Sequence, residues 1–174
     1  MSFDKGCTLD AHLERKPILP ILLVDDDPDD VTLIEEALRG AGVSLPLVHL
    51  ENGQQALEYL SATPPYNDRN LFPLPRLVLL DLKMPKRNGF EVLAWIQAQP
   101  ALADLAVIVL TGSVREEDRK RAEELGAWDF QIKPVSFTEL IRIIRHVEER
   151  WLGQYSHLAF GLRQLNNSRA GSTV

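Results

Sequence analysis

Five polar residues stand where short apolar stretches of the chain end, and their types suit phosphoryl-transfer chemistry. They are Asp25, Asp26, Asp81, Thr111 and Lys133. Carboxylates gathered in one cleft repel each other and raise each other's pKa values unless a cation lies among them, and such oxygen ligands favour Mg²⁺. An Asp beside that metal can attack a phosphoryl group, while an ammonium and a hydroxyl bind its oxygens. The residue types therefore indicate a magnesium-dependent phosphoryl site.

The elements that must position these residues alternate between apolar and amphipathic stretches. Short apolar stretches predict strands at 18–24, 47–50, 77–80, 106–110 and 128–132. Between them, apolar residues at steps of three and four predict helices. Asp27 before Pro28 and Asn52 before Gly53 are start signals for the first two helices. The next two are predicted at 90–98 and 114–125, and Ser136 is expected to cap the last.

Strict alternation of strand and helix predicts an α/β fold with helices on both faces of a sheet. The expected architecture is a doubly wound, five-stranded parallel sheet of order 2-1-3-4-5, the flavodoxin-like arrangement. In such a sheet all strands end at one edge, so the five polar residues should meet there. The 174 residues suit one domain, expected at 17–152, with an N-terminal extension at 1–16 and a flexible tail at 153–174.

Taken in order, these motifs resemble the receiver domain of two-component response regulators. The resemblance covers about residues 18–150 and rests on the segments ILLVDDDPDD, LVLLDLKMP, VIVLTGS and FQIKPV. It implies that Asp81 is the phosphoacceptor and that Thr111 and Lys133 act beside it. It further implies that the Mg²⁺ ligands are Asp25, Asp26, Asp81 and the backbone carbonyl of Lys83.

The resemblance also assigns an output to the chain. Phe130 falls at the position of the family's aromatic switch residue, although by residue type alone it is better explained as core. Because it lacks a tyrosine hydroxyl, its switching would be mainly steric.

The resemblance implies a cis Lys133–Pro134 peptide bond, which would fix the direction of the lysine. Asp27, Asp29 and Asp30 are better explained by helix capping and solvation than by metal binding.

A finer resemblance is to single-domain regulators paired with phytochrome-like histidine kinases. It rests on the DDPDD-type opening, the long loop before the third strand and the long last helix. The expected function is that of a stand-alone response regulator phosphorylated by a sensor histidine kinase. It would be a switch and not an enzyme, with at most slow self-dephosphorylation. The chain beyond residue 153 is too short for a DNA-binding or catalytic output domain, so output would pass through protein contacts.

Three other functions compete with this interpretation. A phosphatase of the haloacid dehalogenase type needs a second Asp two residues after the nucleophile, where this chain has Lys83. A pseudo-receiver that has lost phosphorylation would lack one of the acids or the lysine, and all are present. A nucleotide or flavin binder has no G-x-G-x-x-G or P-loop motif after the first strand to support it.

Composition bears on partners and location. The net charge of −6 argues against nucleic acid or an anionic membrane as a partner. The single Cys7 cannot form an internal disulfide, and there is no secretory signal or apolar run long enough for a membrane span, so a cytoplasmic location is expected. The last helix has more apolar residues than one buried stripe needs, including Ile143 and Trp151. This surplus predicts a homodimer through the fourth and fifth helices and the fifth strand.

Overall fold

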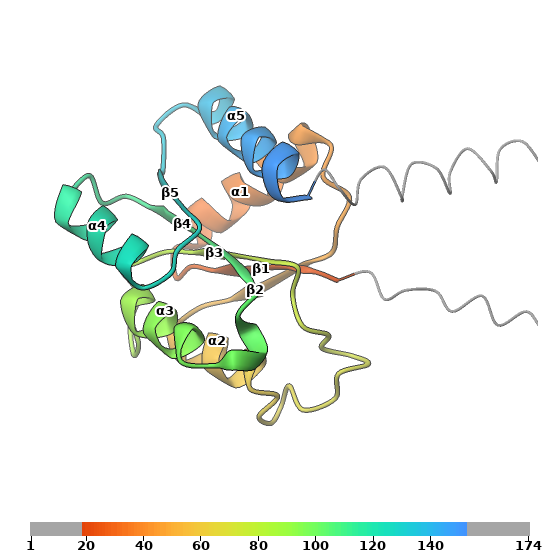
Figure 1. Ribbon diagram of the computed structural model, residues 1–174. Helices are drawn as coiled ribbons and strands as arrows, with labels where there is room; N and C mark the ends of the chain where they lie inside the picture. Colours follow the sequence, from red (N-terminus) through yellow and green to blue (C-terminus); the bar gives the residue numbers. More distant parts are fainter. Residues whose placement is uncertain (1–18, 153–174) are drawn as a thin grey trace, which may run out of the picture.

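The centre of the molecule is a parallel β-sheet built from short apolar strands. The computed structural model describes residues 19–152, and its strands are β1 (Ile21–Val24), β2 (Leu47–Leu50), β3 (Leu77–Leu80), β4 (Ala106–Thr111) and β5 (Asp129–Ile132). Their order is β2-β1-β3-β4-β5, which confirms the predicted order and fold class (Figure 1). Every residue of β1, β3 and β4 is buried, because helices cover both faces of these central strands.

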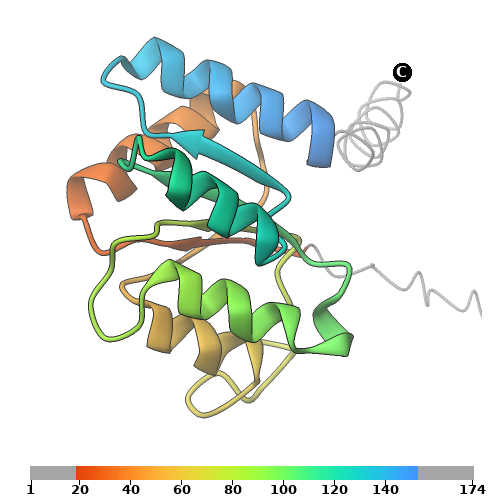
Figure 2. The same ribbon diagram turned by 60° about the vertical axis from the view of Figure 1, so that its left-hand side comes forward.

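Two helical layers enclose the sheet. The helices α1 (Pro28–Ala41) and α5 (Phe137–Val147) cover one face. The other face is covered by α2 (Gly53–Leu60), α3 (Gly89–Gln97) and α4 (Glu116–Glu124), as Figures 1 and 2 show. A 3₁₀ turn, η1 (Pro100–Leu102), precedes β4, and a π-helical turn, η2 (Glu148–Leu152), continues α5. None of the helices within residues 19–152 is long and apolar enough to cross a membrane.

Alternating side chains of each strand supply the two cores. Leu22 and Val24 of β1 belong to the core under α2, α3 and α4, whereas Ile21 and Leu23 belong to the core under α1 and α5. This division follows from the two-residue period of an extended strand. A sheet that is apolar on both faces has room for polar side chains only where its strands end.

Local side-chain caps mark the starts of α1 and α2. Asp27 accepts hydrogen bonds from the backbone N–H groups of Asp29 and Asp30 at 2.9 and 3.4 Å, with Pro28 in the first turn, as the sequence predicted. Asn52 caps α2 in the same way, because its side-chain oxygen accepts a hydrogen bond from the Gln55 backbone N–H. Ser136 stands at the start of α5 but makes no side-chain capping bond there.

Two element boundaries differ from the predicted ones by two residues or more, and several others differ by one residue. β1 begins at Ile21 and not at residue 18, because Pro20 has no N–H to donate to the sheet. α4 begins at Glu116 and not at residue 114, since the chain first makes a turn in which the Ser113 N–H donates to Thr111 Oγ1 and the Ser113 hydroxyl donates to Asp118. This turn separates the end of β4 from the fourth helix.

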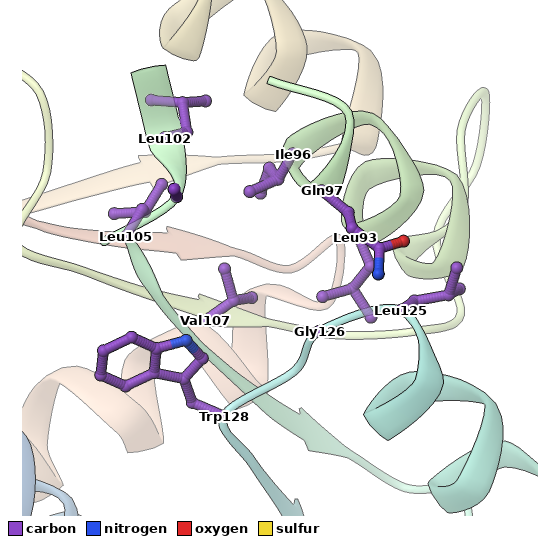
Figure 3. Close-up of a pocket in the computed structure, with 10 residues that line it drawn as sticks. Leu93, Ile96, Gln97, Leu102, Leu105, Val107, Leu125, Gly126 and Trp128 are labelled. Carbon is purple, nitrogen blue, oxygen red and sulfur yellow. The ribbon is translucent and has the colours of Figure 1, made fainter. Parts of the chain in front are cut away.

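A mainly apolar cavity lies at the amino edge of the sheet, where the strands begin. Its volume is about 290 Å³, and it lies between α3, η1 and the starts of β4 and β5 (Figure 3). Leu93, Val107 and Leu125 contribute apolar side chains to its wall, and Trp128 stands at one side of it with 43% of its surface exposed. No charged residue lines this cavity.

The long loop before β3 is held by one arginine and a cluster of aromatic rings. The Arg69 guanidinium donates to the carbonyl oxygens of Tyr59, Leu60 and Phe72 at 2.9, 2.7 and 3.1 Å. The Tyr59 hydroxyl donates to Pro73 O at 2.8 Å, and the rings of Tyr59, Tyr66 and Phe72 pack edge to face or tilted against each other. The loop therefore fixes where β3 enters the sheet.

Candidate functional site

The register of the sheet brings the ends of the strands level with one another. Val24 pairs with Leu80 across β1 and β3, so the residues that follow, Asp25 and Asp81, emerge side by side. The ladder continues one step beyond the strands: Asp81 N donates to Val24 O at 2.9 Å. The first polar residues after these two buried strands are thereby fixed by backbone hydrogen bonds.

Three carboxylates gather at this edge. One oxygen from each of Asp25, Asp26 and Asp81 lies within 4.8 Å of the other two. Asp25 and Asp81 are buried, and Asp26 is exposed. Burial raises the pKa of Asp25, and a hydrogen bond from Lys133 only partly opposes this effect. Three convergent carboxylate oxygens suit a hard divalent cation, so these residues fit the metal that the sequence predicts.

Lys133 lies among the acids. Its backbone N–H donates to Thr111 O at 2.8 Å, which carries the β4–β5 ladder beyond β5. Its Nζ lies 2.7 Å from Asp25 Oδ2, 2.7 Å from Asp30 Oδ2 and 3.6 Å from Asp81 Oδ1. Burial by itself lowers the pKa of Lys133, but the hydrogen bonds to Asp25 and Asp30 outweigh it and raise the pKa above its ordinary value. The lysine is therefore a permanent cation.

The expected cis Lys133–Pro134 bond is wrong. Within residues 19–152 the cis peptide bond is Pro64–Pro65, in the long loop. The direction of the lysine is set instead by the backbone bond to Thr111 and by the two short contacts with Asp25 and Asp30.

Asp30 is the site residue that sequence reasoning missed. Capping explains the role of Asp27, and solvation explains the exposed Asp29. Neither explains Asp30, whose carboxylate contacts Lys133. A signal was available in the sequence. Because only Asp27 separates the acid pair from Pro28, where α1 starts, the first turn of α1 must lie beside the same edge of the sheet.

Asp81 is held by the tight loop that follows it. The Lys83 N–H donates to Asp81 Oδ2 at 2.7 Å, so the Lys83 peptide group lies next to the Asp81 carboxylate. Gly89 N donates to Leu82 O at 3.1 Å, which brings the start of α3 back onto β3. A Cβ added at Gly89 would lie 2.3 Å from Asp81 O, so the loop can approach Asp81 only with glycine at this position.

Thr111 and Phe130 connect this edge to α4. Thr111 is completely buried and accepts a hydrogen bond from Ser113 N at 3.4 Å, and Ser113 is bonded in turn to Asp118 of α4. Phe130 is 3% exposed and lies in the core, with the Arg119 guanidinium of α4 4.7 Å from its ring centroid. Thr111 is therefore linked to α4 through Ser113, and Phe130 contacts the same helix directly.

A known protein family matches most of the chain. The model described as the response regulator receiver domain matches residues 21–145. The chain belongs to the response regulator receiver family. Receivers of this family are signalling switches, and phosphoryl transfer from a kinase is general among them.

Individual relatives of this receiver cover most of its length. The probable methanogenesis regulatory protein FilR2 of Methanothrix harundinacea is 37% identical over 150 residues, which span 86% of this chain and 92% of FilR2. The response regulator Rcp1 of Synechocystis is 34% identical over 139 residues, which span 80% of this chain and 92% of Rcp1.

Solved structures place this receiver near the phytochrome-associated response regulators. The phosphorylated cyanobacterial phytochrome response regulator RcpA superimposes with a TM-score of 0.72 at 34% identity, covering 79% of this chain and 96% of RcpA. The Mn²⁺-bound form of Rcp1 gives a TM-score of 0.69 at 34% identity, covering 77% and 94% of the two chains. The receiver is thus similar to regulators of known fold whose structures include a phosphorylated and a metal-bound form.

Proposed function

We propose that this chain is a stand-alone response regulator that accepts a phosphoryl group from a histidine kinase on Asp81. The observation that carries the proposal is the position of the Asp81 carboxylate, at the end of β3 between two further carboxylates and the Lys133 ammonium. This chain covers 92% of both FilR2 and Rcp1, which supports a regulator of similar length.

The proposed cofactor is Mg²⁺, held by Asp25, Asp26, Asp81 and the backbone carbonyl of Lys83. The three convergent carboxylates support it, as does the Mn²⁺-bound form of Rcp1. When bound, such a cation offsets the negative charge that builds up as an anionic phosphoryl group approaches an acidic cleft. The contact of the Lys83 backbone N–H with Asp81 supports a position of this residue beside the proposed metal.

In the transfer step, a carboxylate oxygen of Asp81 attacks the phosphorus of the kinase phosphohistidine. The new P–O bond forms as the P–N bond breaks, and the imidazole leaves with the electron pair and takes up a proton. Lys133 and the Thr111 hydroxyl then donate hydrogen bonds to the phosphoryl oxygens. Hydrolysis of the acyl phosphate by water resets the switch, so the chain is proposed as a switch and not as an enzyme.

The proposed output face comprises α4, β5 and α5. Movement of Thr111 towards a phosphoryl group would pull on Ser113 and through it on Asp118, while Phe130 would repack beneath Arg119. The loops of this face expose apolar side chains, among them Val114 (76%) and Val135 (108%), and Phe137 of α5 is also exposed. These exposed side chains support a homodimer through this face. Trp151, which also suggested the dimer, lies outside the described side chains.

The proposed kinase is of the phytochrome type, which the similarity to RcpA and Rcp1 supports. The net charge of −6 supports partners other than nucleic acid or an anionic membrane. Together with the absence of a membrane-spanning helix in residues 19–152, it makes the cytoplasm the proposed location.

The test is the intact mass after incubation with a small acyl-phosphate donor, with and without Mg²⁺. A gain of one phosphoryl group is expected only with Mg²⁺, and Asp81→Asn should abolish it. Asp104→Asn removes an equal charge at an exposed position beside η1 and should leave labelling unchanged. A wild-type chain that stays unlabelled under conditions that label other receivers would favour a pseudo-receiver.

A further inference from the structure

Lys133 makes its short contacts with residues other than the proposed phosphoacceptor. Its Nζ is 2.7 Å from both Asp25 and Asp30, but 3.6 Å from Asp81, which is beyond hydrogen-bonding distance. Asp25 and Asp30 occupy two of the three N–H donors of the ammonium, so a phosphoryl group on Asp81 would compete with these two carboxylates for the position of the ammonium. The arrangement is therefore a competition for one cation.

Asp30 is the partner whose only polar side-chain contact within residues 19–152 is with Lys133. Asp25 belongs to the group of three converging carboxylates, whereas Asp30 does not. The Lys133 side chain is 16% exposed and that of Asp30 is 35% exposed, so water screens this pair less than an ion pair on the open surface. The contact also bridges α1 and the end of β5, 103 residues apart in the chain.

We propose that Asp30 is a positioning residue that retains Lys133 in the unphosphorylated protein and releases it when Asp81 carries a phosphoryl group. The proposal rests on the proposed function of Asp81. Its consequence is thermodynamic: breaking the Asp30–Lys133 contact opposes phosphorylation, so the contact lowers the population of the phosphorylated form. Removing Asp30 should therefore favour that form.

The first measurement is the affinity for beryllofluoride, a phosphoryl analogue, at a Mg²⁺ concentration that saturates each variant. Asp30→Asn is expected to bind beryllofluoride about threefold to fivefold more tightly than the wild type, the size of a partly screened ion pair. Asp29→Asn is the matched control, because it removes the same charge from the same helical turn but at an exposed residue with no ion pair within residues 19–152. An Asp30→Asn effect no larger than that of Asp29→Asn would overturn the proposal.

A second measurement follows the lysine itself. Hydrogen exchange of the Lys133 ammonium, observed by ¹⁵N NMR, should be faster in free Asp30→Asn than in the free wild type. The two proteins should become equal once beryllofluoride is bound, because the lysine has then left Asp30. A difference that persists in the bound state would contradict the release, as would Asp30→Glu behaving like Asp30→Asn instead of restoring protection.

The outcomes separate this inference from the proposed function. If the wild type shows no Mg²⁺-dependent binding of beryllofluoride, both are wrong. If the wild type binds but Asp30→Asn and Asp29→Asn are equivalent, Asp81 keeps its proposed role and only the role of Asp30 is lost.

Discussion

The two edges of the sheet differ in chemistry although the same strands form both. At the amino edge, the starts of β4 and β5 border an apolar cavity beside Leu93 and Trp128. At the carboxyl edge, the same two strands end at Thr111 and next to Lys133, among three carboxylates. The parallel direction of the strands makes this separation possible, because it gathers every strand end on one side. Apolar packing can therefore dominate at the amino edge while charged side chains gather at the carboxyl edge.

The contrast predicts that substitutions at the two edges affect different properties. A core residue at the amino edge should change stability with little effect on phosphorylation. A charged residue at the carboxyl edge should change phosphorylation with little effect on stability, since converging like charges do not favour the folded state.

Leu93→Ala should produce the largest loss of stability. Leu93 is 1% exposed and lines the cavity, so its truncation enlarges an existing void and should lower the free energy of unfolding by about 3 kcal/mol. Urea unfolding measures this, with Leu71→Ala, at a 72% exposed leucine, expected to change it by less than about 0.5 kcal/mol. Phosphorylation per folded molecule should match the wild type, and a large drop would break the separation of the two edges.

Gly89→Ala tests where the contrast fails. The added Cβ would lie 2.3 Å from Asp81 O and 2.9 Å from Leu82 Cα. The substitution should therefore lower the free energy of unfolding by about 2–3 kcal/mol, although the position lies at the carboxyl edge. Gly112→Ala is the matched control, because a Cβ there meets nothing within 4 Å. Equal stabilities for the two variants in urea would show that the loop after β3 can relax away from Asp81.

Asp26→Asn should separate function from stability. Asp26 is exposed and makes no ion pair within residues 19–152, so its loss should weaken Mg²⁺ binding by about thirtyfold while leaving the melting temperature unchanged or slightly raised. Calorimetric titration with Mg²⁺ and a thermal scan measure the two effects. Undiminished Mg²⁺ affinity would remove Asp26 from the proposed ligands.

Tyr59→Phe should give the smallest change, and one that depends on pH. Loss of the hydrogen bond to Pro73 O should cost about 1 kcal/mol at pH 7. Burial raises the pKa of Tyr59 above its ordinary 10.0, so the folded state holds this proton more tightly than the unfolded chain does. Wild-type stability must then fall as pH rises above about 10, and Tyr59→Phe, which lacks the proton, must lose less. The measurement is urea unfolding of both proteins at pH 7 and above pH 10. A stability difference between them that is the same under both conditions would contradict this assignment.

The strands and the polar residues at their ends could be predicted from the sequence because they depend on local pattern, and the strand order followed from the alternation of strands and helices. Apolar stretches that end abruptly at Asp25 and Asp81 reveal both the strands and the edge at which they stop. The partner of Lys133 could not be predicted in the same way. Whether the ammonium lies nearer to Asp30 or Asp81 depends on how α1 sits against the end of β5, which no local pattern encodes.

Three predictions that the structure contradicts concern contacts between residues far apart in the fold or in a turn, which local pattern does not show. Asp30 was grouped with the capping acids because its type and position in the first turn of α1 suit that role, yet Asp27 alone satisfies the backbone donors there. The cis Lys133–Pro134 bond was inferred from the family resemblance, whereas the surrounding ion pairs already orient the lysine. The start of α4 moved by two residues because Ser113 finds partners in Thr111 and Asp118.

Because Arg69 bonds to both, we expect the long loop and the last turn of α2 to open as one cooperative unit. The Arg69 guanidinium donates to the carbonyl groups of Tyr59 and Leu60, which the end of a helix otherwise leaves to water. It also donates to the carbonyl group of Phe72 within the loop. Amide protons of the loop and of the end of α2 should consequently exchange together, through one opening event. A protease that cuts the loop would have to wait for that event, so its cleavage rate would report the opening of α2.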